Sequence, residues 1–534
     1  MSKKLSNFVF IAVISLVLTN CANRGNPTGG EKDVTPPVIT KSVPENYSTN
    51  FNAQEIKIYF DEYVKIIDLQ KQLIISPPMD YEPEITPLGA ASKYITIKIH
   101  DTLRPNTTYA FNFGESIVDN NESNPYPYYR YVFSTGSYID SLKVNGSVKN
   151  ALKRETDEFV SVSLYEVDST FTDSIIYKHK PKYITNTLDS TTTFQLENLK
   201  AGKYLLVALK DENSNYTFQQ KKDKIGFHKA FITVPTDSIY ELTLFKETTD
   251  FKTTRPMLVS GNKIAFGYEG DAKDMKLDLL SQVPEEFTSL ITKHPQKDTL
   301  NYWYQPKLEV DSLVFRVANK NYVDTLTVRI KDQIKDSLII KPIEARTLRL
   351  TDDFELQAST PFVNIDHSKI NILDKDSVPV TFTSSLDSYK NRYKLKFDKT
   401  EDNIYRLEML PGAFTEFFGT QNDSLNFNVR TKSLEDYGDL RISLQNPVYP
   451  LIVQLVNQKG DVEMEKYSTS MAPIDFISIT PGKYYLRVIF DTNGNKIYDP
   501  GTYLKKRQSE RVSYYPDLID VRAFSEQVIE LILR

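Results

Sequence analysis

An internal repeat is the feature that most constrains the fold of this chain. Gly202-Lys203-Tyr204 and Gly482-Lys483-Tyr484 stand at an offset of 280 residues, and an apolar run follows each of them. In both copies an Asp-x-Asn-x-Asn loop begins nine residues after the glycine, so the offset is kept without a gap. Repetition at a fixed offset indicates repeated domains. The sequence therefore predicts two related domains that flank a separate central region.

Alternation of apolar and polar residues predicts the secondary structure of the chain. Leu313-Val314-Phe315-Arg316-Val317 is one such run, and the chain is rich in Tyr (33) and Phe (29). These patterns are typical of half-buried antiparallel strands, whereas helical periodicity is scarce. With 534 residues the chain has room for several domains of roughly 100 to 200 residues each. We therefore expect an all-β protein made of tandem β-sandwich domains.

The N-terminus has the pattern of an export signal. Two lysines precede the apolar run at residues 8–18, which is too short for a comfortable membrane span. Leu18-Thr19-Asn20-Cys21 then resembles the lipobox of bacterial lipoproteins. The resemblance implies a signal peptide at residues 1–20 that is removed, and a Cys21 that is acylated, as with palmitate. The alternative is an ordinary secretory signal with an incidental cysteine, but Cys21 is the only cysteine of the chain, and acylation would explain it.

A polar segment follows that cysteine. Residues 21–35 carry Gly, Pro, Asn and charge with almost nothing to bury, so we expect a flexible tether. Within it, Gly29-Gly30-Glu31-Lys32-Asp33-Val34-Thr35-Pro36-Pro37 resembles the stretch after the cysteine in a family of Bacteroidota lipoproteins. This resemblance implies an outer-membrane protein whose first partner is the membrane, through the N-terminal lipid. Acidic residues near an acylated cysteine are linked to surface export in that phylum, so Glu31 and Asp33 favour the cell surface over the periplasmic face.

Residues 36–137 resemble the bacterial Ig-like domain of the SbsA type, which implies a β-sandwich without chemistry of its own. The motifs that carry this resemblance are strand and turn signals, namely Thr35-Pro36-Pro37, Pro44-Glu45-Asn46, Ile56-Lys57-Ile58-Tyr59-Phe60 with Asp61-Glu62 after it, Leu103-Arg104-Pro105-Asn106-Thr107-Thr108-Tyr109 and Tyr131-Val132-Phe133-Ser134-Thr135.

The two copies of the repeat lie in residues 138–246 and 434–534. Both segments resemble the prealbumin-like or carboxypeptidase-regulatory-like sandwich, through the repeated glycine and the strand that follows it. Between them we expect a β-sandwich of uncertain type at residues 247–345. Residues 346–433 echo the first domain in strand order and in the ending Phe427-x-x-x-Thr431, so we expect a degenerate Ig-like β-sandwich there.

The second Asp-x-Asn-x-Asn loop is a candidate metal site. Asp491, Asn493, Asn495 and Asp499 place oxygen atoms at alternate loop positions, as in loops that wrap Ca²⁺. Lys496 replaces the glycine of an EF-hand loop, so the prediction is limited to weak or structural calcium. The alternative is a turn rich in Asn and Gly that only joins two strands. We expect no other cofactor.

Asp followed by Ser or Thr and an apolar residue recurs along the chain, and it is similar to the O-glycosylation signal of exported Bacteroidota proteins. The alternative is that Asp-Ser and Asp-Thr are turn residues before a strand. The candidate hydroxyls are those of Thr102, Ser141, Ser238, Thr299, Ser312, Thr325, Ser337, Ser377 and Ser424.

Signals of catalysis are scarce. The five histidines lie far apart, and no Gly-x-Ser-x-Gly or phosphate-binding Gly-rich motif occurs. The carboxylate pair Asp61/Glu62 has the residue types of a glycosidase, but we expect these side chains at a solvated strand end instead. The aromatic clusters 126–131 and 302–304 have the residue types of a glycan-binding face, but ordinary strands also favour them. We therefore predict a protein that is not an enzyme.

Charge excludes one class of partner, because the net charge is −5 and acids and bases are interspersed, without the basic patch that nucleic acids need. Our leading hypothesis is a multidomain lipoprotein that acts as a rigid rod or platform for protein partners, as in an outer-membrane assembly, secretion or uptake complex. A surface glycan-binding or glycan-processing lipoprotein is the first alternative. A passive structural spacer is the second.

Overall fold

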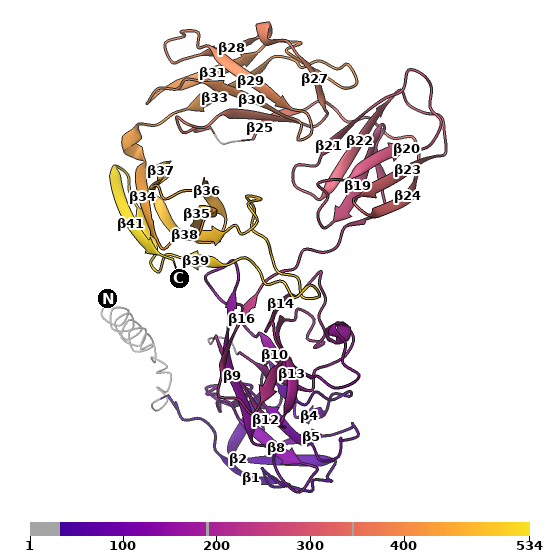
Figure 1. Cartoon of the computed structure of the whole chain (residues 1–534), viewed down its shortest axis with the longest axis vertical. Helices are drawn as coiled ribbons and strands as arrows, with labels where there is room; N and C mark the ends of the chain where they lie inside the picture. The colour runs from indigo at the N-terminus through magenta and orange to yellow at the C-terminus, as the bar shows by residue number, and fades with distance from the viewer. Residues whose placement is uncertain (1–31, 188–191, 344–345, 534) are drawn as a thin grey trace, which may run out of the picture.

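The computed structural model describes residues 32–187, 192–343 and 346–533, so the predicted signal peptide, Cys21 and most of the tether lie outside the described residues. The described strands form five successive sandwiches, which Figure 1 shows from indigo to yellow. The predicted all-β class with tandem β-sandwich domains is confirmed. In the described part of the chain, no helix has the length and apolar character needed to cross a membrane.

The first domain packs a five-stranded sheet on a three-stranded one. The strand order is β1-β2-β5-β4, with β7 also paired to β2, against β3-β6-β8. Phe133 lies in the core between them and stacks on Phe51, with ring centroids 3.9 Å apart. The elements are β1 (Ile39–Val43), β2 (Glu55–Ile66), α2 (Leu69–Gln72), β3 (Ile74–Ser76), β4 (Glu84–Thr86), β5 (Ser92–Lys98), β6 (Thr108–Asn112), β7 (Ile117–Asp119) and β8 (Arg130–Ser134).

Strand β2 corrects one expectation. The sequence predicted that the strand ends at Phe60, with Asp61 and Glu62 after it, but β2 runs on to Ile66. Its register with β5 shifts between Tyr59 and Val64, and from Val64 onward β2 also pairs with β7. This bulge breaks the alternation of apolar residues, so the sequence looks like a strand end. Asp61 and Glu62 therefore lie within a strand.

The second and fifth domains have the same topology. In the second, β11-β10-β13-β14 with β15 on β13 packs against β12-β9-β16, and in the fifth, β36-β35-β38-β39 with β40 on β38 packs against β37-β34-β41. The last strand of each is parallel to the first. The second comprises β9 (Leu142–Asn150), β10 (Ser161–Glu166), η1 (Asp173–Tyr177), β11 (Tyr183–Asn186), β12 (Thr193–Leu199), β13 (Gly202–Lys210), β14 (Lys224–Phe227), β15 (Ile232–Val234) and β16 (Ile239–Leu244). The fifth comprises η3 (Leu434–Asp436), β34 (Gly438–Gln445), β35 (Leu451–Asn457), β36 (Val462–Ser468), β37 (Ile474–Ile479), β38 (Gly482–Phe490), β39 (Val512–Tyr514), β40 (Ile519–Val521) and β41 (Ser525–Ile532).

The repeated Gly-Lys-Tyr motif has the same structural role in both domains. Its glycine is the first residue of β13 and of β38. The Tyr204 hydroxyl donates to the carbonyl oxygen of Lys200 at 3.0 Å, and the Tyr484 hydroxyl donates to that of Thr480 at 2.7 Å. Each tyrosine thus fixes the turn before its own strand, which explains why the motif is repeated.

The third and fourth domains are sandwiches with the strand order of the first domain, and in the fourth the pair β27-β32 takes the place of the pair β2-β7. The third pairs β17-β19-β22-β21, with β18 on β19, with β20-β23-β24, and the fourth combines β25-β26-β30-β29 with β28-β31-β33 and the pair β27-β32. The third comprises β17 (Lys252–Thr253), β18 (Met257–Ser260), β19 (Lys263–Glu269), β20 (Lys276–Leu279), β21 (Thr288–Lys293), β22 (Thr299–Gln305), β23 (Ser312–Asn319) and β24 (Tyr322–Arg329). The fourth comprises β25 (Ile340–Pro342), β26 (Phe354–Ala358), β27 (Phe362–Ile365), η2 (His367–Lys369), β28 (Ile370–Leu373), β29 (Phe382–Asp387), β30 (Arg392–Phe397), β31 (Ile404–Met409), β32 (Phe414–Glu416) and β33 (Leu425–Arg430).

The chain turns back on itself, so the expected rod is wrong. The loop between β38 and β39 inserts Tyr503 against the outer face of the second domain's five-stranded sheet, beside Phe227. The Lys506 ammonium pairs with Asp173 at 2.6 Å, and the Gln508 amide donates to the carbonyl of Phe227 at 2.8 Å. Figure 1 shows the yellow loops of the fifth domain on the purple second domain. The apolar outer face needs a cover, and the fifth domain supplies it.

Candidate functional site

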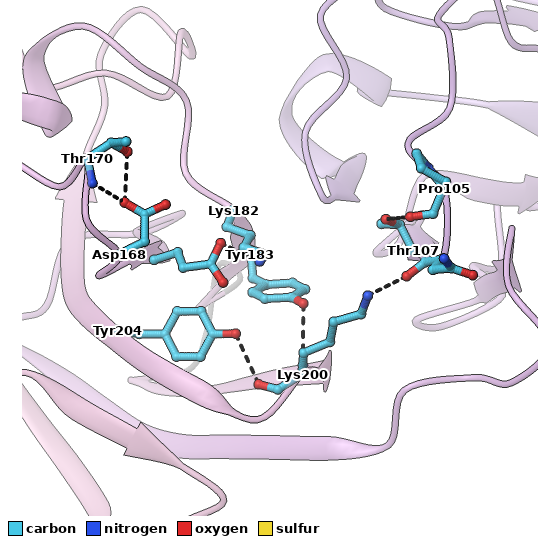
Figure 2. A network of polar contacts seen from close by, with 10 residues as sticks. Pro105, Thr107, Asp168, Thr170, Lys182, Tyr183, Lys200 and Tyr204 are labelled. Carbon is cyan, nitrogen blue, oxygen red and sulfur yellow. Dashed lines mark hydrogen bonds and ion pairs between the residues drawn. The ribbon is translucent and has the colours of Figure 1, made fainter.

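A cleft with a polar lining between the first and second domains is a candidate site. It has a volume of about 470 Å³ and lies between the turn at residues 104–107 of the first domain and the strands β10 and β11 of the second (Figure 2). The turn brings Arg104, while the second domain brings Lys180, Lys182 and Lys200. The two domains therefore build the cleft together.

Lysines of the second domain fix the geometry of this cleft. The Lys200 ammonium donates to the carbonyl oxygen of Asn106, and the Lys180 ammonium donates to that of Met79 at 2.7 Å. The backbone N–H of Lys200 donates to the Tyr183 hydroxyl at 3.3 Å, as Figure 2 shows. The first two hydrogen bonds join the two domains, and the third holds the backbone of Lys200 in position. The walls of the cleft are therefore fixed relative to each other.

The charges of the cleft do not cancel. Four cationic side chains line it, but only Glu166 and Asp168 are anionic. Lys182 pairs with Glu166 at 2.5 Å. Hydrogen bonds from the hydroxyl and backbone N–H of Thr170 lower the pKa of Asp168, so it stays ionised at neutral pH. The remaining positive charge suits a polar or anionic group. The cleft has the means to bind such a group.

Tyrosines close the back of the cleft. Burial raises the pKa of Tyr204 to about 12, and it also raises the pKa values of Tyr165 and Tyr183. Their hydroxyls are therefore protonated at neutral pH. They act as hydrogen-bonding groups within the wall and not as bases.

A second contact beside the cleft fixes the same pair of domains. Arg130 of β8 forms an ion pair with Glu197 of β12 and donates to the side-chain oxygen of Asn198 at 3.0 Å. Burial lowers the pKa of this guanidinium, which nevertheless stays charged, because arginine is protonated far above neutral pH. A cavity of about 570 Å³ adjoins Arg130.

Comparison with known proteins assigns a family to the domain on one side of this cleft. Residues 33–135 match the family described as bacterial Ig-like domain. They form a bacterial Ig-like domain. The match confirms the Ig-like part of the prediction for the N-terminal region, and it indicates no catalytic family. Tandem Ig-like domains are typical of surface or interaction proteins.

Other comparisons add little to the Ig-like match. No curated protein matches the chain. Domains 1–6 of surface layer protein SbsC are 11% identical over 91% of this chain and 67% of that chain, with a TM-score of 0.16. The Bacillus anthracis TIE protein is 9% identical over 95% and 76%, with a TM-score of 0.14. The titin fragment I67–I69 is 10% identical over 53% and 99%, with a TM-score of 0.12. At such TM-scores we base no argument on these structures.

The candidate calcium loop is closed by its own hydrogen bonds. Both Asp491 carboxylate oxygens accept backbone N–H groups, from Gly494 at 2.9 Å, Asn495 at 3.1 Å and Lys496 at 2.9 Å. The side-chain amides of Asn493 and Asn495 both donate to one oxygen of Asp499. These contacts are those of a turn between strands, and calcium binding stays a prediction. Among the described residues, no group of three or more His, Cys, Asp or Glu side chains is placed to hold a metal.

The first copy of the loop is closed in the same way. Asp211 accepts the backbone N–H groups of Asn213 at 3.0 Å and Tyr216 at 2.7 Å. The Asn213 amide donates to Gln219 at 2.7 Å, and Gln219 takes the place of Asp499 in the second copy. Burial raises the pKa of Asp211. The shared aspartate and asparagines are explained by this shared turn.

The candidate glycosylation sites do not gather in one place. Ser312 and Thr299 are partly buried at the starts of β23 and β22, and Thr325 is exposed within β24. The others are exposed residues outside strands, namely Thr102, Ser141, Ser238, Ser337, Ser377 and Ser424. Exposure permits modification at these positions, and glycosylation stays a prediction.

Most of the residues that suggested a glycan-binding face are buried or are held within strands. Tyr302, Trp303 and Tyr304 are buried in the third domain, because their strand β22 is central in its sheet. In the Ig-like domain Tyr131 is buried and Tyr128 is exposed. Burial raises the pKa of Glu62, while Asp61 accepts the backbone N–H of Val38 at 2.8 Å. Residues 302–304 therefore form part of the core, as expected for an ordinary strand, and present no aromatic face.

Sequence reasoning missed the docking loop of the fifth domain. Glu247 is 4% exposed and accepts the backbone N–H of Tyr503 and the amide of Gln220, the latter at 3.0 Å. The Arg487 guanidinium and the Tyr514 hydroxyl both donate to the carbonyl of Leu152, at 3.0 and 2.5 Å. One signal was available, because the loop after the second Asp-x-Asn-x-Asn motif is longer than the loop after the first.

Proposed function

We propose that this protein is a non-enzymatic lipoprotein of the outer membrane, anchored by Cys21 and facing the cell surface, whose domains form a platform for protein partners. The anchor and the location rest on the N-terminal sequence alone. The observation that carries the platform is the docking of the fifth domain on the second, through Tyr503 and the ion pair Lys506–Asp173. It turns a string of sandwiches into one closed body, as a platform requires.

The anchor is tested by labelling cells with palmitate. The intact protein is expected to incorporate the label and to sediment with membranes, whereas Cys21→Ser is expected to lose both properties. Protease added to intact cells reports the orientation, and digestion without lysis is expected. Label that persists in Cys21→Ser would contradict the anchor at this residue.

The platform is tested by purifying the full chain from membranes in mild detergent. A stable protein partner in stoichiometric amount is the expected result. A monomer that emerges alone would contradict the proposal. Binding to a glycan array, without a protein partner, would support the carbohydrate alternative. The aromatic residues 302–304 do not support that alternative, because they are buried in the core.

A further inference from the structure

The last strand of the fifth domain is an open sheet edge. β41 pairs with β34 along its whole length, in parallel and without a register shift, from Ser525 opposite Gly438 to Ile532 opposite Gln445. The sheet order is β37-β34-β41, so the other side of β41 has no strand among the described residues. Figure 1 shows this yellow strand at the outer edge of its domain. Backbone groups at such an edge are a template for another strand.

Apolar side chains accompany this edge. Val528 is 71% exposed and Ile532 is 52% exposed, and they share the outer face of β41 with the exposed Glu526 and Glu530. Just before the strand, Phe524 is 80% exposed and has a φ of 53°, a left-handed conformation that bulky residues rarely adopt. An aromatic ring held in solvent by a strained backbone points to a contact that the isolated chain does not make.

Several of the usual protections of an edge are absent from β41, whose charged residues are Glu526 and Glu530. Its sequence contains no lysine or proline, and its pairing has no bulge. By contrast, the edge strand β36 in the same domain contains Lys466, and its pairing shifts register. The related strand β16 continues into Phe245, which bridges to Ile225 of the opposite sheet. The second and fifth domains share a topology, but only in the second does the chain after the last strand pair with the opposite sheet of the same domain.

Charge selects the occupant of the edge. A second copy of β41 could add to this edge as an antiparallel strand, with the outer faces of both copies on the same side. Every register of that pair places Glu526 or Glu530 opposite another glutamate or opposite an apolar residue. Like charges directly opposite destabilise a pair, whereas opposite charges and apolar pairs stabilise it. A strand with basic residues opposite Glu526 and Glu530, and apolar residues opposite Val528 and Ile532, satisfies both requirements.

We propose that the free edge of β41 binds an extended segment of a partner protein as an added strand of the fifth domain, and that basic and apolar side chains alternate along one face of this segment, at every second residue. The backbone of β41 supplies the hydrogen bonds, the residues of its outer face supply selectivity, and Phe524 covers the end of the added strand. This inference rests on the proposed platform function, because it names the chemistry of a partner.

The first test uses a capped peptide, Lys-Thr-Val-Thr repeated twice, which places Lys and Val in turn on one face of a strand, and the purified full chain in mild detergent. Fluorescence anisotropy is expected to show binding, and hydrogen exchange is expected to slow at residues 525–532 but not in β36. A peptide with Glu in place of Lys is expected to bind at least about tenfold more weakly, since like charges then face Glu526 and Glu530. Unchanged exchange in β41 would overturn the proposal.

Variants separate the edge from the rest of the domain. Val528→Lys is expected to weaken peptide binding by about fivefold or more, because it removes an apolar pair and adds a charge to the edge. Val462→Lys is the matched control, since Val462 is an exposed valine of the edge strand β36, and it is expected to leave binding unchanged. Equal binding by Val528→Lys, or a dimer of the wild type that this variant abolishes, would contradict the proposal.

Failure of this inference is distinguishable from failure of the proposed function. A natural partner that co-purifies equally with the wild type and with Val528→Lys contradicts strand addition at β41 but leaves the platform intact. A wild-type chain without any partner contradicts the platform itself.

Discussion

Replacing Tyr503 tests whether the fifth domain really holds the chain closed. Tyr503 is fully buried, and its ring packs on Phe227 with centroids 5.3 Å apart. Truncating a buried aromatic ring to alanine costs about 3 to 5 kcal/mol. Because this ring lies between two domains, most of that cost falls on docking and not on either sandwich. The docked-to-undocked ratio of Tyr503→Ala should therefore fall by about two to four orders of magnitude.

Hydrogen exchange of residues 498–508 and 224–227 measures this ratio, and both segments should lose protection in Tyr503→Ala. Tyr503→Phe is the matched control. The buried Tyr503 hydroxyl has no hydrogen-bond partner among the described atoms, so its removal should leave docking unchanged or strengthen it by about 1 kcal/mol. Full protection of both segments in Tyr503→Ala would refute the reasoning, as would equal loss in both variants.

Three further changes test other contacts. Burial raises the pKa of Glu247, so the docked form binds the carboxyl proton of Glu247 more tightly than the undocked form does. Docking should therefore weaken as the pH rises from the ordinary glutamate pKa of about 4.3 toward the raised value. Hydrogen exchange between about pH 4 and 7 should show this pH dependence in the wild type but not in Glu247→Gln. Arg130→Ala should cost about 1 to 3 kcal/mol because it leaves Glu197 and Asn198 without their donor, whereas the exposed control Lys57→Ala should change stability by less than about 0.5 kcal/mol in thermal unfolding. Asp491→Ala leaves the backbone N–H groups of Gly494 and Lys496 without an acceptor and should cost about 2 kcal/mol. A rise in the melting temperature with CaCl2 in the wild type alone would establish calcium at this loop, and no rise would exclude it.

The sequence predicted the parts of the fold that depend on neighbouring residues. Alternation predicted the strands, and the Gly-Lys-Tyr repeat predicted two related domains, which share one topology because Tyr204 and Tyr484 fix the same turn. The prediction from the sequence was wrong where the alternation of apolar and polar residues stops. The bulge in β2 places Asp61 and Glu62 within a strand, although their pattern is that of a strand end.

The candidate cleft and the docking loop could not be predicted from the sequence. Arg104 and Lys200 meet across two domains, and Tyr503 contacts residues more than two hundred positions away. No local sequence pattern predicts such contacts. A lysine that is exposed to solvent and a lysine that bonds to a neighbouring domain occur in the same local sequence patterns. At Trp303 the explanation by an ordinary strand holds, because this ring is part of a core.

Docking of the fifth domain also sets an order of events during synthesis. Tyr503 and its acceptor Glu247 are 256 residues apart, so the second domain completes its strands long before its cover is made. Until then the rings of Phe227 and Phe245 on its outer sheet face are exposed to water and to other chains. Such a surface is prone to aggregation. A chain of this design therefore needs rapid folding of its last domain, or a chaperone that occupies the same sheet face in the meantime.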